Sequence, residues 1–237
     1  LRARWQILGQ LLISLIPIAF GLRILFVSNP LGAGVLFFPD ALALGVTIFW
    51  TLGMQNSMNF IDGLDGLSGG ISLLAAVTLG LIALPTSPLL AALCFTLAGA
   101  LVGFLRHNFH PASIYMGTSG ILAVAYALAV LAILGTAKVA AALLILGVPI
   151  IDAFFVILGR LLAGRSPYTP DKSHIHRRLL DNGFSHRSAV LVLYGITALL
   201  SIGALLLTES ATLYAFAGLL VVLGGVAVYL SRRAEGL

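Results

Sequence analysis

The chain consists mainly of long apolar stretches, and this feature leaves few folds open to it. Eight stretches are long enough for a membrane-crossing helix, which needs about 20 mainly apolar residues to cross roughly 30 Å of hydrocarbon. They cover residues 7–27, 36–55, 66–85, 87–105, 119–136, 138–159, 188–207 and 211–230. Helices are expected, because the runs are too long and too uniformly apolar for the strands of a membrane barrel. The sequence therefore predicts an all-α, polytopic membrane bundle of about eight transmembrane helices.

The composition supports a membrane location. Hydrophobic residues make up 60% of the 237 residues and charged residues only 9%, which is too little polar surface for a water-soluble globule. No basic soluble segment with interleaved aromatic residues is present, so no nucleic-acid partner is expected. The single cysteine, Cys94, lies in a predicted span, which excludes an internal disulfide and favours a packing role. We expect one integral membrane domain over residues 1–237.

The basic residues are distributed unevenly between the two sets of predicted loops. If the N-terminus is cytoplasmic, all 13 Lys and Arg residues except Arg23 and Lys138 lie in cytoplasmic segments. This is the distribution that the positive-inside rule requires. We therefore expect a multi-pass protein of the plasma (inner) membrane with both termini in the cytoplasm.

Three polar loops lie on the predicted cytoplasmic side, and together they hold all five histidines. They cover residues 55–70, 106–120 and 159–188, while the connections on the opposite side are short or featureless. Loops held by a rigid scaffold often carry binding and catalytic residues. We expect the three loops to meet and form a site at one membrane surface.

The first polar loop contains two of the eight acidic residues, Asp62 and Asp65, each followed by glycine. Asn56 and Asn59 precede them with the same spacing of three, and side chains so spaced share a face of a helical turn. Such a cluster could bind a divalent cation through hard oxygen ligands, or hold a nucleotide. The alternative is that these residues only cap the ends of two membrane helices.

The third polar loop is strongly basic. From Arg160 to Arg187 it holds six basic side chains and three histidines, enough to neutralise a diphosphate. His174 and His176 could act as acid, base or phosphate donor. The alternative is that its arginines only follow the positive-inside rule or bind anionic lipid headgroups. The sequence SHIHRR favours a site.

Asp152 is an ionisable residue inside the sixth predicted span, about two helical turns before Arg160. A charged group there should face the bundle interior and have a partner. It either supports the site from behind or is a protonated structural group, and we favour the supporting role.

Five stretches, in their order along the chain, resemble a known family. They are MNFIDGLDGLSGG, RHNFHPASIYMGTSG, LAVLAILGTAK, GVPIIDAFFVILGR and GRSPYTPDKSHIHRRLLDNGFSHR. They are similar to the polyprenyl-phosphate N-acetylhexosamine-1-phosphate transferases of glycosyltransferase family 4 type, which are membrane enzymes of cell-envelope polysaccharide synthesis. The resemblance covers nearly the whole chain. It is closer to the undecaprenyl-phosphate GlcNAc-1-phosphate type than to the muramoyl-pentapeptide type, because HIHRRLL follows GRSPYTPDKS.

The resemblance implies phosphoryl transfer at the cytoplasmic face. A polyprenyl (undecaprenyl) phosphate would attack the β-phosphorus of a UDP-N-acetyl sugar, with UDP-GlcNAc as the expected donor, and UMP would leave. Mg²⁺, or Mn²⁺ in its place, would neutralise the diphosphate. Such chemistry depends on positioning and charge neutralisation more than on covalent catalysis. The expected partners are this lipid, the UDP-sugar and the membrane, and a homodimer is an open alternative to a monomer.

The resemblance also implies roles for particular residues. Gly63, Leu64 and Asp65 would line a uracil pocket, with Tyr115 stacking on the base. The candidate catalytic residues are Asp62, Asp65, His174 and His176. The candidate substrate-binding residues are Asn56, Asn59, Gly63, Leu64, Asn108, Tyr115, Thr118, Arg160, Arg177 and Arg178.

Three features depart from the family pattern. Thr118 stands where relatives usually have the aspartate that binds Mg²⁺, which leaves Asp62 as the candidate metal ligand. Arg177 stands where the family commonly has a third histidine. The chain begins at LRARWQILGQ, a stretch that in the family follows an aspartate pair and the first few helices. We therefore expect either a fragment of an enzyme or a truncated, inactive relative.

Two other classes of function are open to the sequence. A carrier or permease would place polar residues near the membrane midplane and often show inverted repeats. No repeat is apparent in the sequence, and Asp152 is the one residue that supports this class. A lipid-phosphate-binding scaffold without turnover is the other alternative, and Thr118 favours it. Release of UMP from UDP-GlcNAc would distinguish the transferase from both.

Overall fold

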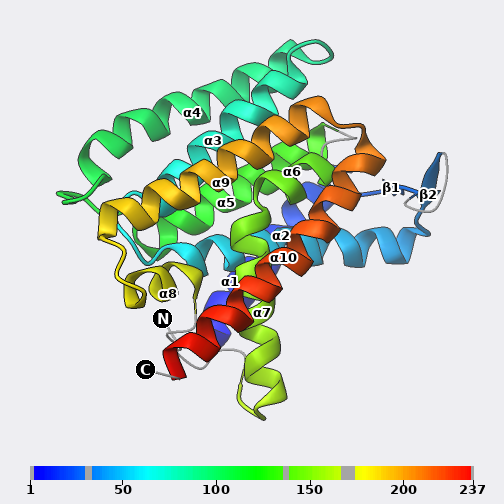
Figure 1. Cartoon of the computed structure of the whole chain (residues 1–237). Coiled ribbons are helices and arrows are strands. Elements are labelled where there is room, and N and C mark those ends of the chain that lie inside the picture. Colours follow the sequence, from blue (N-terminus) through cyan, green and yellow to red (C-terminus); the bar gives the residue numbers. More distant parts are fainter. Residues whose placement is uncertain (1–2, 30–33, 136–138, 167–173, 236–237) are drawn as a thin grey trace.

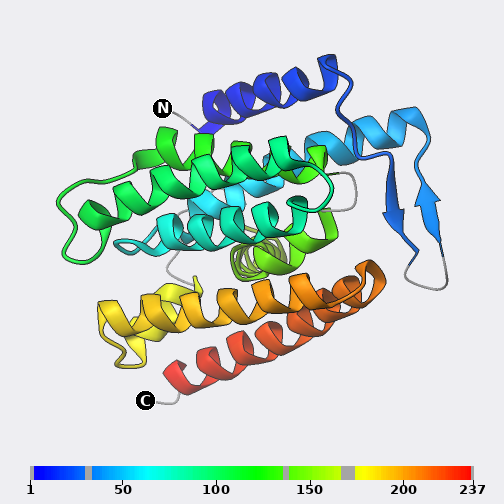
Figure 2. The same ribbon diagram turned by 90° about the horizontal axis from the view of Figure 1, so that it is seen from above.

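The computed structural model describes residues 3–29, 34–135, 139–166 and 174–235, and this part of the chain forms ten helices and one small hairpin (Figures 1 and 2). The helices are α1 (Ala3–Ala19), α2 (Asp40–Ile61), α3 (Leu67–Ala83), α4 (Pro88–Asn108), α5 (Gly117–Leu134), α6 (Val139–Ile145), α7 (Gly147–Leu162), α8 (Ile175–Asp181), α9 (His186–Leu206) and α10 (Glu209–Glu235). Strands β1 (Phe26–Ser28) and β2 (Val35–Phe37) pair antiparallel, with Phe26 opposite Phe37. The predicted all-α bundle is confirmed.

Helix α3 occupies the centre of the bundle, where it contacts α2, α4, α5, α6 and α9. Its glycines allow this close packing, because a Cβ at Gly70 would lie 1.9 Å from the Tyr194 ring, and one at Gly80 would lie 2.9 Å from Phe95. Small residues at helix interfaces are typical of membrane bundles. On the other side of the core, the Trp50 indole donates a hydrogen bond to the Ala129 carbonyl at 3.1 Å and joins α2 to α5.

Three of the described helices, α4, α5 and α9, are long and apolar enough to cross a membrane alone. The pair α6 and α7 passes the same test together, but the two helices are bent by 75° at their junction. Helices α1, α3 and α10 contain shorter apolar segments. The chain is therefore a membrane protein, while the predicted number of eight spans is not confirmed.

Three predicted spans differ from the helices that form. The first, 7–27, was expected to be one helix, but α1 ends at Ala19 and residues 26–28 form β1. Pro17 lies in the last turn of α1 and Gly21 adopts a left-handed φ of 80°, so the helix stops there. The second, 36–55, begins in β2, and α2 starts only at Asp40. The sixth, 138–159, breaks between α6 and α7, where Pro149 in the first turn of α7 lacks the amide hydrogen that a continuous helix would need.

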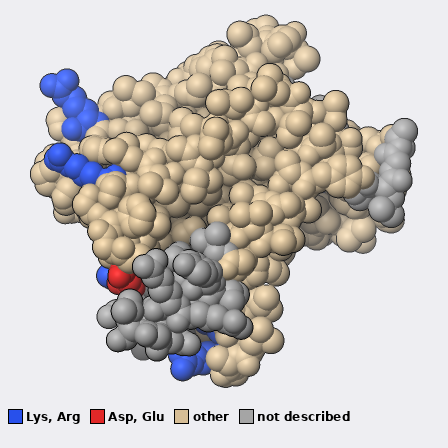
Figure 3. Space-filling model, in the orientation of Figure 1, with Lys and Arg blue, Asp and Glu red and all other residues tan. Residues whose placement is uncertain are grey.

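Charged side chains gather at one end of the molecule. On the face shown in Figure 3, those of the described residues lie at the end that carries α8 in Figure 1, and the rest of the described surface is uncharged. At the N-terminal end of α2, the Arg23 guanidinium lies 3.8 Å from the carboxylate of the exposed Asp40. Lys138, the other basic residue expected on that side, lies outside the described residues. At the polar end, where α8 lies, the loops after α2 and α4 meet each other and the start of α8.

Candidate functional site

The loop between α2 and α3 forms the centre of the polar end. Asp62 occupies the C-cap position of α2, and Gly66 precedes α3 with a left-handed φ of 80°, a conformation that favours glycine. The two residues do stand at helix ends, as the capping alternative expects. However, the Asp62 carboxylate binds the Ser68 hydroxyl and the Asp65 carboxylate binds the His110 ring, rather than backbone groups of the two helix ends. Capping alone therefore does not account for the two carboxylates.

Asp62 lies at the surface of the site. Its Oδ1 accepts a hydrogen bond of 2.5 Å from the Ser68 hydroxyl on the first turn of α3. The surrounding protein removes part of its water and raises the pKa of this carboxyl above its usual value, and the bond from Ser68 opposes that shift. Asp62 is thus an accessible carboxylate whose negative charge a bound cation would stabilise.

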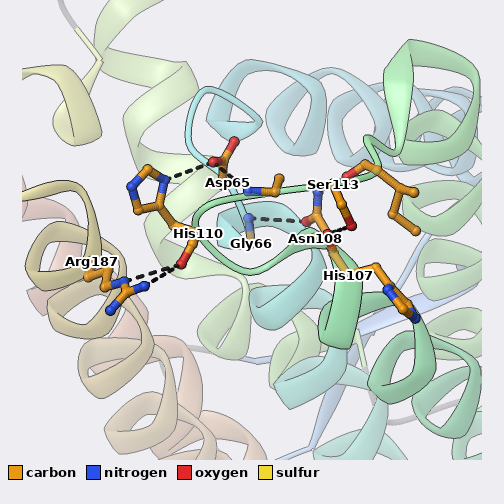
Figure 4. Close-up of polar contacts among 9 residues, drawn as sticks. Asp65, Gly66, His107, Asn108, His110, Ser113 and Arg187 are labelled. Atoms are coloured by element: carbon orange, nitrogen blue, oxygen red, sulfur yellow. Dashed lines mark hydrogen bonds and ion pairs between the residues drawn. The ribbon is translucent and has the colours of Figure 1, made fainter.

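Asp65 contacts His110, as Figure 4 shows, and forms a cluster with His110 and His186. Its Oδ2 lies 2.8 Å from His110 Nδ1 and 3.2 Å from the Ala112 amide, which donates to it. The His110 and His186 rings stack at 4.1 Å between centroids. The hydrogen bond from His110, with smaller contributions from Ala112 and the charge of His186, holds the pKa of Asp65 below its usual value. Asp65 is therefore ionised at neutral pH.

Hydrogen bonds of Asn108 and Arg187 fix the loop after α4 to this arrangement (Figure 4). Asn108 Oδ1 accepts from the Gly66 amide at 3.1 Å, and its Nδ2 donates to the Ile114 carbonyl at 2.9 Å. Arg187 on α9 donates two hydrogen bonds, of 3.0 and 3.2 Å, to the His110 carbonyl. Asn108 was predicted to contact substrate, and the structure uses both ends of its amide to join two loops.

Asp152 positions the first turn of α8. Its Oδ2 lies 2.7 Å from His174 Nδ1, and its Oδ1 accepts from the Ile175 amide at 2.7 Å. The Asp152 side chain is only 7% exposed. A carboxylate that binds the free amide at a helix start stabilises that end of the helix. Asp152 thus faces the interior with a partner, as predicted, and it connects α7 to the histidine motif.

His176 brings the histidine motif against the acidic loop. A Cβ at Gly63 would lie 2.2 Å from His176 Nε2, so the ring passes directly over this glycine. The His174 and His176 rings are nearly parallel, 5.6 Å apart. Burial lowers the pKa of His176 to about 4, so the ring is neutral at pH 7. The three polar loops therefore do meet, at Gly63 and at Asp65.

The basic residues take two positions relative to this site. Arg160, at the end of α7, is buried, and its guanidinium lies 5.7 Å from the centroid of the Phe60 ring. Phe60 in turn lies 5.7 Å from the His174 ring. Arg177 on α8 is exposed, and Arg178 is half-buried. Arg160 is therefore packed in the interior behind Phe60 and His174, whereas Arg177 and Arg178 lie nearer the solvent.

Other predicted site residues are less closely tied to Asp62. Asn56 Nδ2 donates to Gln10 on α1 and to the Leu52 carbonyl, both at 2.8 Å, so it serves helix packing. Leu64 is buried in the core, and Asn59 is half-buried. Tyr115, which is 74% exposed, and Thr118, on the first turn of α5, are both accessible to solvent. Their roles stay predictions.

The sequence reasoning assigned no role to four residues that build the site: Phe60, Ser68, His110 and His186. A signal existed for the histidines, since all five fall in the polar loops. No signal could pair His110 with Asp65, because 45 residues separate them.

Comparisons with known proteins identify the family. The model of the family glycosyl transferase family 4 matches residues 1–136. A probable undecaprenyl-phosphate N-acetylglucosaminyl 1-phosphate transferase of Bacillus subtilis is 37% identical over 226 residues, which is 90% of this chain and 61% of the relative. A decaprenyl-phosphate N-acetylglucosaminephosphotransferase of Mycobacterium tuberculosis is 32% identical over 258 residues, 96% of this chain and 64% of the relative.

A third relative matches a shorter part. A phospho-N-acetylmuramoyl-pentapeptide-transferase of Trichormus variabilis is 43% identical over 108 residues, 46% of this chain and 28% of the relative. This chain thus spans less than two thirds of the length of all three relatives. Because the family model matches more than half of its residues, and the loops that carry the family resemblance meet in one site, the chain belongs to glycosyl transferase family 4.

Proposed function

We propose that this chain is the site-bearing part of an enzyme that transfers N-acetylglucosamine 1-phosphate from UDP-GlcNAc to a polyprenyl (undecaprenyl) phosphate, with release of UMP. The product would start the synthesis of a cell-envelope polysaccharide. The observation that carries this proposal is the meeting of three loops, distant in sequence, around residues 62–66. The names of the Bacillus and Mycobacterium relatives support this class of donor and acceptor.

The location of the site follows from the same proposal. The charged end of the bundle would face the cytoplasm, where UDP-sugars are made, and both termini would lie on that side of the plasma membrane. The uneven distribution of charge in Figure 3 supports this orientation. Residues 1–237 would act as one membrane domain.

Mg²⁺ fits the oxygen donors at Asp62. Mg²⁺ in proteins is usually held by one or two carboxylates and completed by water and substrate phosphates. Asp62 offers an accessible carboxylate beside the Ser68 hydroxyl, and its raised pKa reflects a negative charge that lacks compensation. Asp62 would hold the ion, which when bound neutralises charge on the diphosphate.

The remaining residues would bind and orient the two substrates. Neutral His176, held by its stack on His174, carries one ring N–H that can donate a hydrogen bond to a phosphate oxygen. Arg177 and Arg178 would supply permanent positive charge. The exposed Tyr115 ring is available to stack on uracil, and the backbone of Gly63 can approach the nucleotide closely.

The first test is release of UMP from UDP-GlcNAc by membranes that contain the protein, polyprenyl phosphate and Mg²⁺. In this assay Asp62→Asn is expected to lower turnover at least about tenfold, the effect of losing roughly 1.4 kcal/mol of transition-state stabilisation. The matched control is Asp40→Asn, which removes the same charge at the opposite end of α2 and should retain turnover. Equal turnover in the two variants would refute the assignment of Asp62.

The second test concerns Thr118, which stands where the resemblance expects a magnesium ligand. Thr118→Asp is expected to lower the Mg²⁺ concentration for half-maximal turnover, by about tenfold if one added contact contributes about 1.4 kcal/mol. Ser119→Asp adds the same charge to the neighbouring exposed position and is the control. An unchanged Mg²⁺ titration for Thr118→Asp would place the ion elsewhere.

Thr118 also favours a second function, binding of a lipid phosphate without turnover. That scaffold would bind polyprenyl phosphate and release no UMP, whereas a carrier would do neither. The UMP assay, together with binding of radiolabelled polyprenyl phosphate, distinguishes the three.

A further inference from the structure

The cluster of Asp65, His110 and His186 differs in chemistry from the oxygen donors at Asp62. It combines one carboxylate with two imidazoles, and one donor atom from each of the three residues lies within 4.8 Å of the other two. The three residues come from the loop after α2, the loop after α4 and the first turn of α9. No role in the proposed transfer requires His110 or His186.

We propose that Asp65, His110 and His186 bind a divalent cation of intermediate softness, of the class of Zn²⁺, at a site separate from the Mg²⁺ at Asp62. Imidazole nitrogen is a preferred ligand for such cations, whereas Mg²⁺ prefers oxygen. Three protein ligands with a fourth position open to water or substrate are the usual arrangement of an open zinc site.

Two of the three ligands, Asp65 and His110, need only a small adjustment to hold the ion. With zinc–ligand bonds of about 2.0–2.2 Å, tetrahedral donors stand about 3.4 Å apart. His110 Nδ1 and Asp65 Oδ2 are now 2.8 Å apart, so they would separate by about half an ångström. The ion would take the place of the shared proton at His110 Nδ1, and the neutral ring would then carry its proton on Nε2.

The surroundings hold the ligands in place. Asp65 Oδ2 is also bound by the Ala112 amide, and the His110 carbonyl is bound by Arg187. Ser185 accepts a hydrogen bond from the Ser188 amide and thereby fixes the start of α9, where His186 lies. Outer contacts of this kind orient metal ligands and raise affinity.

His186 gives an independent sign of an unfilled position. Its Nε2 is buried and has no hydrogen-bond partner among the described residues. A buried polar atom without a partner is costly, and a bound ion or water is one of its common explanations. A cation bound at this nitrogen would give it a partner.

The test is direct measurement of Zn²⁺ binding to the purified protein in lipid nanodiscs, after a chelator has removed metals. A chromophoric chelator competes for Zn²⁺ in the presence of millimolar Mg²⁺. One Zn²⁺ per chain is expected, with an affinity that Mg²⁺ does not change. His186→Gln is expected to weaken that affinity at least about tenfold, since it removes one of three ligands. Equal affinity of the parent protein and His186→Gln overturns the proposal, and so does displacement of the ion by Mg²⁺.

His107→Gln is the matched control. His107 is an exposed histidine on the last turn of α4, and in Figure 4 its ring points away from Asp65. This variant removes an imidazole three residues from His110 and should bind Zn²⁺ like the parent protein. Loss of binding in His107→Gln overturns the assignment of the ligands.

A second measurement keeps the proposal testable if His186→Gln does not fold. Co²⁺ bound to the parent protein should show the strong visible absorption of a four-coordinate nitrogen and oxygen site, and Zn²⁺ should remove it. No such absorption at saturating Co²⁺ overturns the proposal. None of these readouts needs turnover, so the result does not depend on the proposed function.

Discussion

Asp152→Ala is expected to lower transferase turnover about a hundredfold, although this residue need not touch either substrate. Asp152 binds both the His174 ring and the Ile175 amide at 2.7 Å, and it is nearly buried. Removing a buried hydrogen-bond acceptor leaves its two donors without a partner, which typically costs about 1–3 kcal/mol for each. Helix α8 has seven residues and is too short to be stable without such contacts. Its release would move His176 away from Gly63, and a hundredfold effect corresponds to about 2.7 kcal/mol.

The control for this prediction is Asp181→Ala. Asp181 is an exposed acidic residue at the end of the same helix, so the variant has the same change of charge without the buried contact. Hydrogen exchange of the α8 amides should become faster in Asp152→Ala and stay unchanged in Asp181→Ala. Asp152→Asn keeps an oxygen for the Ile175 amide and should fall between the two. If Asp152→Ala retained the turnover of Asp181→Ala, Asp152 would not be the residue that positions α8.

The fold class could be predicted because it depends on one quantity, the length of the apolar runs. The ends of the helices could not, because hydropathy does not distinguish a helix from an apolar hairpin. Phe26 and Phe37 count as membrane residues by composition, yet they pair across two short strands with ring centroids 5.7 Å apart. The break between α6 and α7 is equally invisible to a window average, since Leu146 at the junction is as apolar as its neighbours.

The meeting of the three loops was also predicted, because short connections between antiparallel helices return the chain to the same surface. The partners within the site were harder to predict. Spacing alone placed Asn56 near Asp62, but Asn56 binds Gln10, 46 residues earlier, and helps to pack α1 on α2. The pairing of Asp65 with His110 likewise depends on how α4 crosses α3, which no local pattern records. Local spacing indicates which faces are polar, and tertiary packing decides which polar groups meet.

Gly63→Ala is expected to lower turnover about thirtyfold, because it inserts one methyl group between the acidic loop after α2 and His176 on α8. Its Cβ would lie 2.2 Å from His176 Nε2 and 2.8 Å from Cε1, closer than any real contact. The His176 ring cannot move aside freely, because it is 3% exposed and stacked on His174. Overpacking of a filled space typically costs about 1–3 kcal/mol, and about 2 kcal/mol at the transition state corresponds to about thirtyfold in rate.

Two further variants decide whether the loss comes from this contact. Gly103→Ala adds the same methyl group on α4, where a Cβ meets nothing within 4 Å, and should retain both turnover and Tm. The double variant Gly63→Ala with His176→Ala removes the ring that the methyl would strike. Its Tm should therefore exceed the value expected from adding the two single effects, because residues in contact are not additive. Strict additivity, or a Gly63→Ala protein as active as Gly103→Ala, would mean that the acidic loop and α8 are not pressed together at this glycine.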